Sequence, residues 1–173
     1  MSRPFPTALA LIGALAIAAT AIPAAAHAQV IGLAGVYVPA SSGRLASFGG
    51  AADIGYMAAY GPLGVWGAIG GEYQRQREGG PGRGRVSGDL RFLPVRFQTS
   101  LVPFVGGSVS ANRSGGKLSE WTGTRTGLDV LAGLLYSSSD KSVVGISAQE
   151  RFGYVRGMPH AFATEVGIRF PFR

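Results

Sequence analysis

The strictest constraint on this chain is an alternation of apolar residues with small or charged ones, which recurs along most of its length. The clearest example is the last segment, where one parity carries Phe162, Thr164, Val166, Ile168, Phe170 and Phe172. The other parity carries Ala163, Glu165, Gly167, Arg169 and Pro171. Because successive side chains of a β-strand point to opposite faces, this period predicts strands with one apolar face.

The alternation and the turn residues between its runs predict eight strands. The expected ranges are 30–38, 50–60, 64–75, 86–96, 101–111, 121–136, 142–155 and 161–172. We expect long connections at 39–49 and 76–85 and a very short one at 61–63. Long and short connections then take turns, as in an up-and-down barrel with two unlike ends.

The uncharged run 54–71 is long enough to suggest a membrane-spanning helix, but its composition argues against one. It contains six glycines, and Pro62 lies near its middle. Proline removes a helix hydrogen bond and glycine weakens a helix, so two strands joined by a tight turn are favoured.

The first 28 residues have the layout of a secretory signal peptide. Arg3 precedes an uncharged run rich in Ala, Leu and Ile, and small residues at Ala26 and Ala28 suit cleavage after Ala28. The expected organisation is a cleaved signal over 1–28 and a single domain over 29–173. An uncleaved anchor would need neither the Pro23 break nor the Ala-x-Ala ending.

The composition of the two strand faces decides between a soluble sheet and a membrane barrel. The less apolar face is mostly Gly, Ala and Ser with charges of both signs, which suits the inside of a narrow closed barrel. The apolar face on every strand would then meet lipid. The predicted fold class is all-β, an eight-stranded antiparallel up-and-down transmembrane β-barrel. The charges expected in its interior are Asp53, Glu72, Asp89, Arg91, Arg125, Asp129, Glu165 and Arg169.

Two segments carry a family resemblance. Residues 103–110 form a Pro-aromatic-x-Gly strand, and 167–172 form an aromatic closing strand. With the pattern of the whole domain, they resemble the small eight-stranded outer-membrane β-barrel family of Gram-negative bacteria. The resemblance implies a cell outer membrane location, with termini and short turns in the periplasm and longer loops outside. It also implies that Phe170 and Phe172 signal assembly to the outer-membrane insertion machinery, although Arg173 follows them.

An arginine cluster surrounds a glycine-rich segment at 79–82. Its members are Arg75, Arg77, Arg83 and Arg85. Guanidinium groups pair bidentately with phosphate, so one interpretation is a loop that contacts lipopolysaccharide or another anion. The alternative is a solvated glycine loop without a ligand.

The sequence offers few residues that could form a catalytic or metal-binding site. The chain has no cysteine, and the expected mature domain has one histidine, His160, without a neighbouring serine or a Gly-x-Ser-x-Gly elbow. We therefore expect no catalytic residues, cofactor or metal. Nucleic-acid binding would need a basic aromatic face that is missing here. The expected partners are outer-membrane lipid and lipopolysaccharide, and the expected state is a monomer.

These observations predict a non-enzymatic barrel with an envelope or surface-interaction role, filled by paired charges rather than open as a pore. Two alternatives stay open: an exported soluble lipocalin-like barrel with an apolar ligand inside, and a small lipid-modifying enzyme. The direction of Phe162, Val166, Ile168 and Phe170 separates the first alternative from the membrane barrel. Inward side chains would line a ligand cavity, and outward ones would meet lipid.

Overall fold

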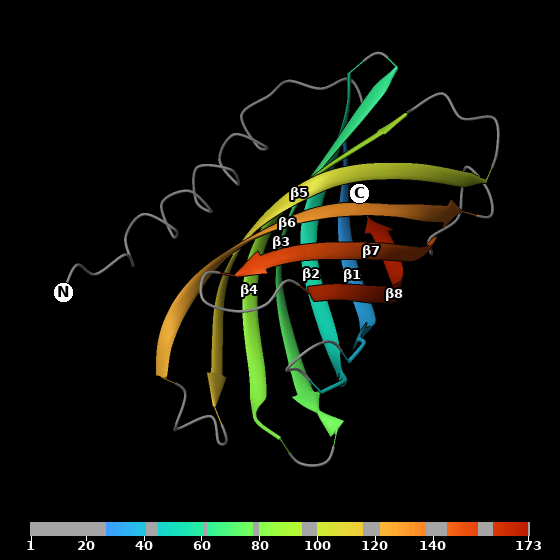
Figure 1. Cartoon of the computed structure of the whole chain (residues 1–173). Helices are drawn as coiled ribbons and strands as arrows, with labels where there is room; N and C mark the ends of the chain where they lie inside the picture. Colours follow the sequence, from blue (N-terminus) through green and yellow to red (C-terminus); the bar gives the residue numbers. More distant parts are fainter. Residues whose placement is uncertain are drawn as a thin grey trace.

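The protein forms a closed barrel of eight antiparallel strands (Figure 1). The computed structural model describes residues 27–40, 45–60, 62–77, 80–94, 100–115, 122–137, 145–155 and 161–172. The strands are β1 (His27–Val38), β2 (Ser47–Tyr60), β3 (Leu63–Gln76), β4 (Gly82–Pro94), β5 (Leu101–Gly115), β6 (Thr122–Ser137), β7 (Gly145–Val155) and β8 (Ala161–Phe172). The predicted fold class and strand number are confirmed. Within the described ranges, no helix has the length and apolarity to cross a membrane.

Each strand pairs with its neighbours in sequence, and β8 returns to β1. This closing ladder runs from Gln29 opposite Phe172 to Tyr37 opposite Thr164. One irregularity interrupts the β5–β6 ladder between Asn112 and Ser114. Gly123 lies beside it with a φ of 66°, a left-handed conformation that glycine adopts without strain.

The barrel has two ends. We call the end where β1 begins and β8 ends the base, and the opposite end the mouth. The connections at the mouth include 77–81, which is shorter than the predicted 76–85 because β4 begins at Gly82. At the base, β6 ends at Ser137 and β7 begins at Gly145; the short connection expected between them lies outside the described residues.

The apolar parity faces outward. Phe162 is 59% exposed, Val166 53% and Val130 65%, and Ile168 is also exposed. A belt of exposed Ile, Leu, Val and aromatic side chains surrounds the barrel, which is far more apolar surface than a soluble monomer presents. The lipocalin-like alternative, which needs these side chains inside, is therefore excluded.

Near the base, apolar side chains fill the lumen. The buried members of this cluster are Val30, Trp66, Ala68, Leu93 and Phe104, and Met57, Val102 and Leu135 pack against it. Most lie within a few residues of the base ends of their strands. Toward the mouth the described part of the lumen becomes more polar, with a small apolar cluster of Val36, Val38 and Ala163 on β1 and β8 and the buried Val155 on β7.

Two glycines make room for this polar filling. A Cβ at Gly32 would overlap the guanidinium of Arg169, and a Cβ at Gly153 would overlap the carboxylate of Asp129. Small residues on the inner face therefore leave room for charged side chains of the neighbouring strands, as the sequence pattern indicated.

Candidate functional site

Two arginines stack on a buried tryptophan above the apolar base. The guanidinium carbon of Arg91 lies 4.3 Å from the centroid of the Trp66 ring, and that of Arg169 lies 5.1 Å from it. The Trp66 ring meets Phe104 edge-on, with 6.2 Å between centroids. Trp66 is 1% exposed. Cation–π contacts out of water are worth about 2 kcal/mol, so this stack joins the apolar base to the charges above it.

The first ionic layer lies directly over this stack. Arg91 pairs with Asp89 at 2.9 Å, and Arg169 pairs with Glu165 at 3.2 Å. Arg169 also pairs with Asp53 over Gly32 of the intervening strand β1, and it donates through Nε to the hydroxyl of Ser147 at 2.9 Å. Residues from β2, β4, β7 and β8 thus meet in one layer.

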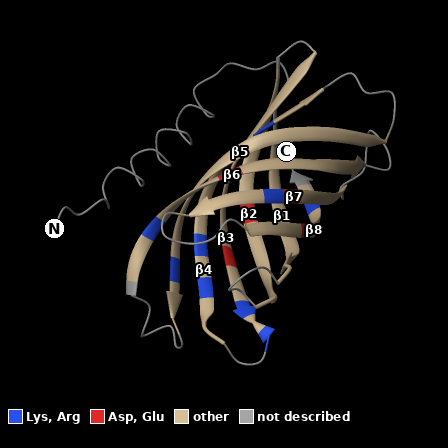
Figure 2. Ribbon diagram, in the orientation of Figure 1, with Lys and Arg blue, Asp and Glu red and all other residues tan. Residues whose placement is uncertain are grey.

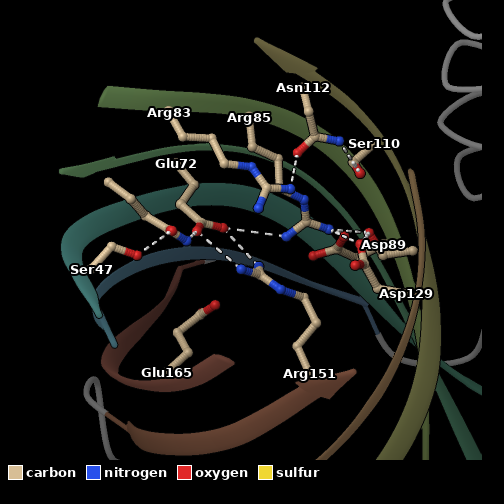
Figure 3. Close-up of polar contacts among 12 residues, drawn as sticks. Ser47, Glu72, Arg83, Arg85, Asp89, Ser110, Asn112, Asp129, Arg151 and Glu165 are labelled. Carbon is tan, nitrogen blue, oxygen red and sulfur yellow. Dashed lines mark hydrogen bonds and ion pairs between the residues drawn. The ribbon is translucent and has the colours of Figure 1, made fainter. Parts of the chain in front are cut away.

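The second ionic layer lies closer to the mouth and centres on Glu72 (Figure 3). Glu72 pairs with Arg151 at 2.7 Å and with Arg85 at 3.3 Å. Arg85 also pairs with Asp129 and donates to the hydroxyl of Ser108 at 2.6 Å. Because a buried charge without its partner is costly, these contacts fix β3, β4, β6 and β7 relative to one another.

Above the second layer, two cavities lie at the mouth. The larger measures about 130 Å³ and is lined by Ser47, Gln74, Gln76 and Arg83, among others. The smaller and deeper one, about 20 Å³, shares Gln74 and Arg83 with it and adds Arg85 and Arg151. The larger has room for several waters.

Hydrogen bonds hold the walls of these cavities. Arg83 donates to the amide oxygen of Asn112 at 2.7 Å, and Asn112 donates to Ser110 at 2.9 Å. The hydroxyl of Ser47 donates to Gln74 at 3.0 Å, and Gln74 in turn donates to Glu72.

The predicted arginine cluster is divided between two faces of the barrel wall. Arg75 is exposed on the outer side of β3, and Arg77 is exposed just beyond the end of that strand. Arg83 is half-buried in the mouth, and Arg85 is buried in the second ionic layer. The four residues therefore do not form one loop site, because β4 begins early and its alternation directs Arg83 and Arg85 inward.

Two further arginines lie near the mouth. Arg113 is exposed on β5 and donates to Thr124 at 2.9 Å. Arg125, predicted as an interior charge, lies opposite Asn112 on the same parity of β6 as the lumen-facing Asp129, and it is exposed beside the ladder irregularity. Figure 2 shows basic residues of β3, β4, β5 and β6 near this end of the barrel, whereas Arg91 of β4 lies deeper, in the first ionic layer.

The structure places the other expected interior charges in the lumen. They are Asp53, Glu72, Asp89, Arg91, Asp129, Glu165 and Arg169. Sequence reasoning missed Arg85 and Arg151. The alternation itself could have indicated Arg151, because it shares the parity of Gln149 and Gly153 on β7.

Several of the residues singled out from the sequence do not take part in a site in the described structure. Ala26 and His160 lie outside the described residues, and Ala28 lies within β1. Phe170 is half-buried and Phe172 ends β8. Across the described ranges, no three His, Cys, Asp or Glu side chains are placed to hold a metal ion.

Comparison with solved structures identifies the architecture. Neisserial surface protein A superposes with a TM-score of 0.61 at 19% sequence identity, over 84% of this chain and 97% of that chain. The N-terminal β-barrel domain of Pseudomonas aeruginosa OprF gives 0.57 at 15% identity, with the same two coverages. The chain has the fold of the small eight-stranded outer-membrane β-barrels. This fold and its lipid-facing belt fit the outer membrane.

A third small outer-membrane barrel with this fold is Ail, the attachment invasion locus protein of Yersinia pestis. It gives a TM-score of 0.56 at 15% identity over 84% of this chain and 97% of that chain. Ail in complex with the heparin analogue sucrose octasulfate gives 0.51 at 15% identity over the same shares. No protein-family model matches the sequence, and no curated protein matches it.

Proposed function

We propose that this outer-membrane barrel presents its mouth outside the cell and binds phosphate groups of lipopolysaccharide with arginines on its outer wall. The base would then face the periplasm. The role is one of scaffold and surface contact, and it needs no catalytic step.

The observation that carries this proposal is the position of Arg75 and Arg113. Among the outward-facing strand positions that the structure describes, these are the basic residues, and both lie within three residues of the mouth end of their strand. Arg75 lies one outward row beyond Tyr73, which is exposed. An aromatic row marks a membrane interface, so arginines just beyond it lie at the depth of lipid headgroups.

Other aromatic pairs mark the same interface around the barrel. Tyr37 and Phe48 stack with 4.9 Å between ring centroids, and Phe152 and Phe162 with 4.8 Å. All four lie toward the mouth on the outer face. In the outer leaflet, the anionic groups at this depth would be lipopolysaccharide phosphates, which a guanidinium binds bidentately. The complex of Ail with sucrose octasulfate supports the idea that a barrel of this fold can bind a sulfated saccharide.

The test is retention of lipopolysaccharide by the purified barrel. The double variant Arg75→Gln/Arg113→Gln should bind phosphorylated lipopolysaccharide at least tenfold more weakly than the parent chain. The control is Arg83→Gln, which removes one positive charge from the inner side of the mouth and should retain binding, whereas Arg75→Gln and Arg113→Gln, each of which also removes one charge, should each weaken it. Equal binding by the parent chain to phosphorylated and dephosphorylated lipopolysaccharide would contradict the proposal.

The lipid-modifying alternative remains a prediction that rests on His160. If His160→Ala left the masses of envelope lipids unchanged, the scaffold role would stand. A lost lipid modification would instead favour the enzyme.

A further inference from the structure

The geometry points to a second binding site, inside the mouth, for a soluble sugar that carries one oxyanion group, a phosphate or sulfate ester. This site lies on the inner face of the wall and is independent of the outward-facing Arg75 and Arg113. Its binding residues are Arg83 and Arg85, with Gln74, Gln76, Ser47 and Ser114 around them.

The cavity has a size and lining suited to such a ligand. It measures about 130 Å³ and is lined by Arg83 together with uncharged polar side chains. Amide and hydroxyl groups of this kind hydrogen-bond sugar hydroxyls, whereas a guanidinium binds an oxyanion through a planar fork. The lining of this larger cavity therefore combines one basic group with several neutral ones.

A buried donor beneath this cavity points to an acceptor. Arg85 is 7% exposed and lines the deeper cavity, yet its Nε–H has no hydrogen-bond partner. A buried donor of this kind calls for an acceptor, which can be a water molecule or an oxygen atom of a ligand. An ester oxygen that enters between Arg83 and Arg85 would supply one.

The surrounding contacts hold the two arginines in position before a ligand arrives. Arg85 is held by Glu72 and Asp129, and Arg83 by Asn112. The carboxylate of Asp129 also lines the deeper cavity, and it would repel a second negative charge that reached the floor. The site therefore favours a single anionic group near Arg83, with the sugar ring directed toward the opening.

The experiment uses the full mature barrel, refolded in zwitterionic micelles without lipopolysaccharide. Glucose 6-sulfate and glucose 6-phosphate are titrated by calorimetry, with glucose, inorganic sulfate and inorganic phosphate as comparison probes. We expect both esters to bind at least tenfold more tightly than glucose or the inorganic ions. The Nε–H resonance of Arg85 should shift on titration with either ester.

Two variants localise the binding. Arg83→Gln should weaken ester binding at least tenfold, whereas Arg75→Gln should leave it unchanged. Ser114→Leu fills the cavity without altering charge and should weaken binding as well. The heat-dependent gel shift shows that each variant is folded.

Three outcomes would overturn the inference. Glucose binding as tightly as its esters would remove the role of the anion, and inorganic ions matching the esters would remove the role of the sugar. Equal losses in Arg83→Gln and Arg75→Gln would place binding on the outer wall. Because no lipopolysaccharide is present, these outcomes are separate from failure of the proposed function.

Discussion

Charged side chains have different surroundings on the two faces of the barrel wall. On the lumen face, each carboxylate in the two ionic layers has an arginine within ion-pair distance. On the lipid face, Glu150 lies among apolar neighbours and accepts a hydrogen bond from Thr164 at 2.7 Å. Both faces belong to the same strands and differ only in parity. The comparison shows that solvent exposure alone does not describe a residue's environment, because an exposed side chain here meets hydrocarbon.

The largest effect should come from breaking the second ionic layer. Glu72→Ala leaves Arg85 and Arg151 buried without their shared carboxylate, which should cost about 3–5 kcal/mol of unfolding free energy. Urea unfolding of the barrel in phospholipid vesicles measures it. The matched control, Glu150→Ala, removes a carboxylate from the other face and should not destabilise the barrel. Equal losses for the two variants would contradict the distinction between the faces.

A charge introduced on the lipid face should lower the free energy of unfolding, and the loss should be larger the deeper the charge lies in the membrane. Val130→Arg, in the middle of the outer face of β6, should cost about 2–4 kcal/mol. Thr126→Arg lies two outward rows nearer the mouth on the same strand and should cost about 1 kcal/mol or less. The same vesicle-based unfolding assay compares them. If both arginines were tolerated equally, the apolar belt would not be in contact with hydrocarbon.

The aromatic stack in the lumen should show a smaller effect with a second readout. Trp66→Leu keeps part of the apolar volume but loses the ring on which Arg91 and Arg169 stack, at a cost of about 2–3 kcal/mol. Recordings across a planar bilayer should also show ion conductance above that of the parent barrel. Phe104→Leu, which alters the same cluster but leaves the Trp66 ring in place, should conduct less than Trp66→Leu.

The smallest expected effect is a gain in stability rather than a loss. Glu150→Leu removes the carboxylate from the lipid face and should stabilise the barrel by about 1 kcal/mol, less the value of one hydrogen bond. Unfolding in vesicles should show this gain, and the free energy of unfolding of Glu150→Gln should lie between those of the parent chain and of Glu150→Leu. A clear destabilisation would indicate that Glu150 has a partner beyond Thr164.

The fold could be predicted from the sequence because the alternation of inward-facing and outward-facing residues can be recognised within each strand by itself. In 161–172 and 86–92, alternation alone separated the lipid-facing side chains from the lumen-facing ones. The segment 82–85 was expected within a connection, because a Gly-Arg-Gly-Arg run has the composition of a loop. In the structure its glycines pair along the β3–β4 ladder while Arg85 enters the lumen.

The ionic layers could not be assembled from the sequence, because their partners are distant in it. Arg151 donates to Glu72 across a separation of 79 residues. In the sequence, Arg151 follows Glu150, and two adjacent opposite charges are typical of a solvated surface. In the structure the two side chains point to opposite faces of the strand. Only the register of all eight strands brings Arg151 over Glu72.

The pairing of β8 with β1 also determines when the barrel can form. β1 finds its second neighbour only when β8, the last strand in the described residues, is in place. A variant without β8 would expose two unpaired edges at once, on β1 and on β7, rather than lose one strand from the edge of an open sheet. All eight strands must therefore be paired before hydrocarbon surrounds the sheet, because an unpaired edge in lipid is costly.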